Sequence, residues 1–91
     1  MKNHATSLEA FERIKPQLTD LQIMVMNAAR RLQSFTDAEI SMEFPGRAYS
    51  TVRTRRGELV KMGLIRKTDK RREKSAVWEV VEGGEEQGTL F

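Results

Sequence analysis

The chain has no cysteine, and its 91 residues include a single histidine and a single tryptophan. Without cysteine it can form no disulfide, no thiolate metal site and no cysteine nucleophile. The one histidine, His4, stands near the N-terminus and gives a histidine-based catalytic or metal site almost no support. The carboxylates fall mostly at helix-capping positions or near the C-terminus, so paired acid–base chemistry is not indicated. We therefore expect no enzyme, no catalytic residues, no metal and no cofactor.

Long apolar segments are also missing. The longest apolar run, Ile23 to Met26, is far shorter than the about 20 residues that a membrane-spanning helix needs. The first residues, Met1 to His4, contain no apolar stretch of the kind found in a signal peptide. We expect a protein that binds no membrane and lies in the cytoplasm.

Positive charge is concentrated in one block. Residues 47–74 hold eleven Lys and Arg and three acidic residues, a net charge of +8. Residues 1–46 carry a net charge of −1, and residues 75–91 carry −4. Such a block is typical of a protein that binds a polyanion, and nucleic acid is the first candidate. The alternative is a basic surface that is only solvated.

Capping signals divide the first half of the chain into helices. Three Thr-x-x-Glu/Gln pairs have the spacing of a capping box, which marks a helix start. The pairs are Thr6 with Glu9, Thr19 with Gln22, and Thr36 with Glu39. They predict a short helix that ends before Pro16, a second helix over about 20–33, and a third that Pro45 ends. Residues 34–35 are expected to be an extended link, and the methionines at 24, 26, 42 and 62 to fill the core.

A fourth helix is expected over 48–62, with Val52 and Leu59 toward the core. A left-handed C-cap at Gly63 would end it. A strand over 64–67, a polar turn over 68–75 and a returning strand over 76–81 should follow, with Trp78 on the buried face. We expect residues 1–5 to be flexible, residues 6–82 to form one domain and residues 83–91 to be an acidic flexible tail.

This order of elements resembles the winged helix-turn-helix superfamily over about residues 6–81. Several short segments are similar to small winged-helix DNA-binding proteins encoded by phages and prophages. They are Ile14-Lys15-Pro16, Thr36-Asp37-Ala38-Glu39-Ile40, Arg56-Gly57-Glu58-Leu59-Val60, Gly63-Leu64-Ile65 and Val77-Trp78. The resemblance implies a mainly α fold, with a three-helix core, an extra N-terminal helix and a two-stranded wing. It also implies that helix 48–62 reads the major groove and that wing 66–76 contacts the DNA backbone.

The expected function is sequence-specific binding of double-stranded DNA, as a monomer or homodimer, by a phage or bacterial transcriptional regulator. Side chains at the start of helix 48–62 can reach base edges, because this part of such a helix enters the groove. The candidate base contacts are Arg47, Ser50, Thr51, Arg53 and Thr54. The candidate phosphate contacts are Tyr49, Gly57, Lys61, Lys67, Lys70, Arg71, Arg72 and Lys74. For Tyr49, closing the core is the alternative, and Gly57 would let the DNA backbone approach closely.

Two arginines and the tryptophan have alternative roles. Arg55 and Arg56 either contact phosphates or pack their stems over the apolar face, with their heads paired to acidic groups such as Glu58 or Glu39. Trp78 is either an anchor of the core under the hairpin or a platform for base stacking.

The last five residues, 87–91, resemble the pentapeptide by which bacterial polymerases and repair proteins dock on the DNA sliding clamp. Gln87, Leu90 and Phe91 match its leading glutamine and closing Leu-Phe, whereas Gly88 and Thr89 depart from the commoner residues. The resemblance implies an alternative function, a replication or repair accessory factor that binds both DNA and the clamp. The tail could instead fold back on the domain or stay unstructured. A third hypothesis is a winged helix that binds only protein.

Overall fold

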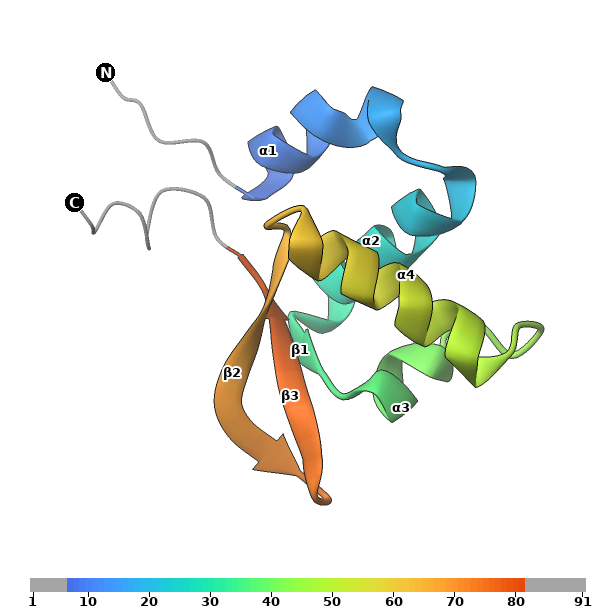
Figure 1. Ribbon diagram of the computed structural model, residues 1–91, viewed down its shortest axis with the longest axis vertical. Coiled ribbons are helices and arrows are strands. Elements are labelled where there is room, and N and C mark those ends of the chain that lie inside the picture. The colour runs from blue at the N-terminus through green and yellow to red at the C-terminus, as the bar shows by residue number, and fades with distance from the viewer. Residues whose placement is uncertain (1–6, 82–91) are drawn as a thin grey trace.

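The computed structural model describes residues 7–81, which form four α-helices, a short 3₁₀ turn and a three-stranded antiparallel sheet (Figure 1). The helical elements are α1 (Ser7–Ile14), η1 (Lys15–Gln17), α2 (Asp20–Leu32), α3 (Asp37–Ser41) and α4 (Tyr49–Lys61). The strands are β1 (Ser34–Phe35), β2 (Ile65–Arg72) and β3 (Ser75–Val80). The chain is therefore a compact α+β fold over the described residues.

Two of the three predicted capping boxes begin the helices that they were expected to begin, and Thr6 of the third lies outside the described residues. The Thr19 hydroxyl accepts from the Gln22 N–H at 3.2 Å, and the Gln22 side chain accepts from the Thr19 N–H at 2.9 Å. Thr36 and Glu39 form the same reciprocal pair at 3.2 and 3.0 Å. Because these bonds satisfy N–H groups that a helix start leaves unpaired, they define the first turns of α2 and α3.

The C-terminal end of α4 also follows the prediction. Gly63 adopts a φ of +82°, a conformation that glycine takes without a steric penalty. The Leu64 N–H donates to the Leu59 carbonyl at 3.0 Å, and the Gly63 N–H donates to that of Val60 at 3.0 Å. This capped turn leads the chain from α4 directly into β2.

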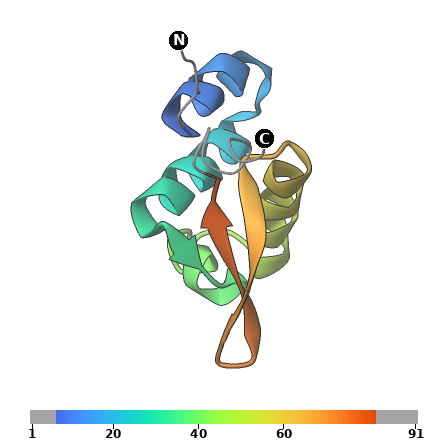
Figure 2. The ribbon, with the colours of Figure 1, turned by 90° about the vertical axis from the view of Figure 1, so that its left-hand side faces the viewer.

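The sheet is larger than the sequence predicts. Its strand order is β1-β3-β2, so the expected link at residues 34–35 is an edge strand, and Phe35 pairs with Trp78. β2 continues to Arg72 through most of the expected polar turn, and only Glu73 and Lys74 make the turn, with φ of 52° and 70°. The prediction of a turn over 68–75 was wrong, because these polar residues belong to a hairpin that projects beyond the helices (Figures 1 and 2).

The core lies between the helices and the sheet. Its fully buried large side chains come from every layer of the fold: Phe11, Val25, Met26, Phe35, Ile40, Val52, Leu59 and Ile65. The expectation that four methionines fill it was wrong for three of them. Met24, Met42 and Met62 are 43%, 77% and 37% exposed. Met24 lies off the buried stripe of α2, and the other two lie just beyond the ends of α3 and α4.

Candidate nucleic-acid interface

α4 divides into a buried face and an outer face. Val52, Arg56 and Leu59 are buried, toward the rest of the fold. Most of the residues predicted to read bases lie outside this face: Arg47, Ser50, Arg53 and Thr54 are exposed, and Thr51 is half-buried. The structure therefore places the predicted base readers at the N-terminal half of α4 and in the turn before it, where they are accessible.

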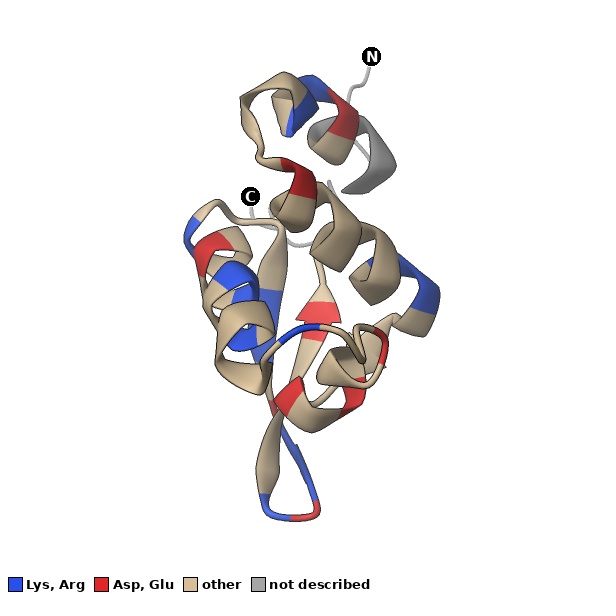
Figure 3. Ribbon diagram, turned by 90° about the vertical axis from the view of Figure 1, so that its right-hand side faces the viewer, with Lys and Arg blue, Asp and Glu red and all other residues tan. Residues whose placement is uncertain are grey.

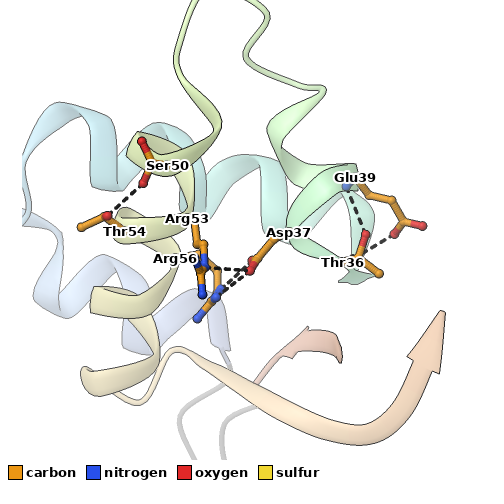
Figure 4. Close-up of polar contacts among 7 residues, drawn as sticks. All are labelled: Thr36, Asp37, Glu39, Ser50, Arg53, Thr54 and Arg56. Carbon is orange, nitrogen blue, oxygen red and sulfur yellow. Dashed lines mark hydrogen bonds and ion pairs between the residues drawn. The ribbon is translucent and has the colours of Figure 1, made fainter. Parts of the chain in front are cut away.

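The predicted phosphate contacts on α4 also lie on its accessible side. Tyr49 is 50% exposed at the first residue of the helix, so it does not close the core. Lys61 is exposed in the last turn. A Cβ built on Gly57 would meet no other atom within 4 Å, so the helix surface there is open to a close neighbour. Thr54 donates its hydroxyl to the Ser50 carbonyl at 2.8 Å, along one edge of α4 (Figure 4).

Arg56 has the structural role that the sequence offered as an alternative. Its Nε and Nη2 donate to the two carboxylate oxygens of Asp37, each at 2.7 Å. Its guanidinium lies 3.8 Å from the centre of the Trp78 ring, and the residue is only 8% exposed. A planar guanidinium suits both a bidentate carboxylate and an aromatic face. Arg56 therefore joins α4 to α3 and β3, and Trp78 serves as its platform.

Arg55 also pairs within the protein. It donates through Nη2 to Glu58 at 3.0 Å, and Glu58 accepts from the side chain of the buried Gln22 at 2.7 Å. Gln22 thus closes the capping box of α2 and holds α4 with the same side chain. This network supports the structural alternative for Arg55, with the partner that the sequence suggested.

Arg53 has a looser contact with the same aspartate as Arg56. Its Nε lies 3.7 Å from Oδ2 of Asp37, and its side chain is 64% exposed. Figure 4 shows Arg53 and Arg56 directed toward Asp37, away from the edge that carries Ser50 and Thr54. Sequence reasoning missed Asp37, because its position shows only that it follows the capping residue Thr36. No local spacing relates it to residues 16 and 19 positions later.

The hairpin carries the second group of predicted contacts. The five cations of the hairpin that are predicted to contact phosphates, Lys67, Lys70, Arg71, Arg72 and Lys74, are all exposed. Two of them have partners: Arg71 donates to the Lys74 carbonyl at 2.9 Å, and Arg72 pairs with Glu39. The hydrogen bond from Arg72 lowers the pKa of Glu39 below its ordinary value of 4.5. Within residues 7–81, the three lysines have no acidic partner.

The charges form two basic regions with an acidic element between them. Figure 3 shows Lys and Arg along α4 and in the hairpin, with acidic residues of α3 beside them. The carboxylates of Asp37 and Glu39 each hold an arginine, from α4 and from β2 respectively. Both basic regions are thus connected to α3 through side chains.

Comparison of the chain with protein-family models, with curated proteins and with solved structures gives no match. Among the described residues, no group of three or more His, Asp or Glu is placed to hold a metal ion. No helix within residues 7–81 has the length and apolarity to cross a membrane. The predicted clamp-binding residues Gln87, Leu90 and Phe91 lie outside the part of the chain that the structure describes.

Proposed function

We propose that the chain is a winged helix-turn-helix protein that binds double-stranded DNA sequence-specifically, as a phage or bacterial transcriptional regulator does. The observation that carries the proposal is the combination of an accessible polar face on α4 with a projecting cationic hairpin. The polar face of α4 and the cations of the hairpin lie within residues 47–74, the block that has a net charge of +8. The elements follow one another in the order α3, turn, α4 and hairpin, which suits a helix-turn-helix with a wing.

In this proposal the N-terminal half of α4 enters the major groove, which is wide enough to admit a helix. Arg47 and Arg53 donate to guanine, because an arginine can engage two acceptors on that base. The hydroxyls of Ser50, Thr51 and Thr54 reach bases or nearby phosphates. These contacts provide the sequence preference of the complex.

The hairpin positions the protein on the DNA backbone. Lys67, Lys70 and Lys74 contact phosphates, which neutralises charge without reading sequence. Arg72 contributes only after it leaves Glu39, because that carboxylate already holds its guanidinium. Arg55 and Arg56 take no part, since their guanidinium groups are engaged within the fold.

The salt dependence of binding tests this proposal. Six to eight neutralised phosphates predict a slope of about −5 to −7 for the logarithm of the binding constant against the logarithm of salt concentration. Fluorescence anisotropy with a labelled duplex measures it. Lys70→Ala should make the slope less steep by about 1, whereas Arg13→Ala, on α1, should leave it unchanged. A slope near zero for the unaltered protein would contradict the proposal.

A further inference from the structure

Four side chains form a continuous path from the core of the fold to the outer face of α4. Trp78 lies under the guanidinium of Arg56, which donates to Asp37, and Asp37 faces Arg53. We infer that Asp37 is a positioning residue that orients Arg53 for donation to a guanine and thereby determines specificity at that base pair. The inference rests on the proposed function and assigns Asp37 a part in it.

The first step is the immobility of Asp37. Both of its oxygens accept hydrogen bonds at 2.7 Å from one guanidinium, so the plane of the carboxylate is set by Arg56. Arg56 is held in turn by the Trp78 ring, and the side chains of Arg56 and Asp37 are only 10% and 14% exposed. Asp37 also follows Thr36, whose capping box determines the backbone at the start of α3. The carboxylate is thus a rigid point in the fold.

The second step is the part of Arg53 that faces this carboxylate. Its closest approach is from Nε, at 3.7 Å from Oδ2. A guanidinium has five N–H donors, of which Nε–H is one, so engaging this edge leaves donors of the terminal nitrogens for a base. Guanine offers two acceptors in the major groove, O6 and N7. Arg53 is 64% exposed, so its outer end is accessible to such a base.

The third step is that stability does not require this contact. An exposed ion pair at this distance contributes little to folding, and Asp37 already has a bidentate partner in Arg56. A carboxylate close to DNA also lowers affinity, because it repels phosphates. Its benefit lies in restraining a side chain with large rotamer freedom before the base is bound. Asp37 thus lowers the affinity for DNA of any sequence and raises the discrimination between bases at the position that Arg53 reads.

Binding-site selection from random duplexes, followed by anisotropy titrations, tests the inference on the 91-residue chain. The base pair that Arg53 reads is the one whose preference disappears in Arg53→Ala. Asp37→Asn keeps the size of the side chain and an acceptor for Arg56. It should lower the preference at that base pair by about 2- to 5-fold, as loss of one exposed ion pair does, and binding to random duplex should stay equal or become stronger. In the Arg53→Ala background the same replacement should cause no further loss of affinity for the selected duplex.

Arg47 provides the matched control, because no acidic side chain in residues 7–81 pairs with it. Preference at the base pair that Arg47 reads should not change in Asp37→Asn. An equal loss of preference at both base pairs, or a further loss of affinity in the Arg53→Ala background, would overturn the inference, because Asp37 would then act through the placement of α4. No duplex binding by the unaltered protein would overturn the proposed function itself, which is a different result.

A second measurement needs no variant and so does not depend on folding of Asp37→Asn. Side-chain ¹⁵N relaxation of the unaltered protein without DNA reports the motion of each arginine Nε–H before a base is bound. An order parameter for Arg53 close to that of Arg56 supports the inference. A value below about 0.6, equal to that of an unrestrained arginine, would overturn it.

Discussion

Replacing Arg56 by alanine removes the side chain that joins α4 to α3 and β3. The variant loses two hydrogen bonds to Asp37 and the contact with the Trp78 ring. Asp37, which is only 14% exposed, is left without its bidentate partner. Breaking a buried pair in this way costs more than the pair contributed, because an uncompensated charge stays behind.

The expected loss of stability in Arg56→Ala follows from how deeply the two side chains are buried. Removing one partner of a buried ion pair costs about 3–5 kcal/mol, and about 3 kcal/mol applies here because Asp37 keeps some access to water. A domain of this size has a free energy of unfolding of about 5–10 kcal/mol. Arg56→Ala should therefore lower Tm by about 12 °C or more. Arg53→Ala removes an ion pair that is 3.7 Å long and whose arginine side chain is 64% exposed, and should cost less than about 0.5 kcal/mol.

Urea unfolding followed by circular dichroism measures both variants, and the fluorescence of Trp78, the single tryptophan, gives a second probe. Arg56→Met combined with Asp37→Leu should recover most of the loss, because apolar side chains of similar volume leave no buried charge. Equal stability of the Arg56→Ala and Arg53→Ala variants would refute the reasoning. It would mean that the Asp37–Arg56 pair is not buried in solution.

Two further variants separate stability from binding. Gly57→Ala should raise the free energy of unfolding by about 0.5–1 kcal/mol, because alanine favours the helix and its Cβ would meet open space. The same Cβ should weaken duplex binding, because the DNA backbone approaches α4 at Gly57 in the proposed complex. Unchanged binding would place the DNA elsewhere on α4. Glu39→Gln keeps the capping box but loses the ion pair with Arg72, at a cost of at most about 0.5 kcal/mol for side chains 36% and 45% exposed. Because the pKa of Glu39 is lowered in the fold, the stability difference should be present above pH 4.5 and disappear as the pH falls through the lowered pKa. A difference that persists in strong acid would exclude Glu39 as its source.

Local signals predicted the helices better than the strands. Capping boxes and a C-cap glycine act through neighbours in sequence, so α2, α3 and the end of α4 follow from the residues that form them. The length of β2 depends instead on pairing with β3, and a run of polar residues gives no sign of it. The exposure of Met42 depends on where α3 ends, which periodicity does not determine.

In the candidate site, too, local features could be predicted from the sequence and tertiary contacts could not. The spacing of Val52 and Leu59 predicts which face of α4 is buried, and the accessible face follows from it. The acidic partners of the arginines could not be predicted, because Asp37 and Arg56 are 19 positions apart and meet only in the fold. The sequence therefore indicated that Arg56 has two possible roles, and the tertiary contacts decide between them.

Chemical-shift mapping during titration with a short selected duplex tests most directly whether α4 and the hairpin bind DNA together. At about 50 mM salt, where phosphate contacts are strong, the largest amide shifts should fall within residues 47–57 and 66–75. Residues of α1 and η1 should change little. An absence of shifts with duplex DNA, or shifts confined to α1 and η1, would contradict the account.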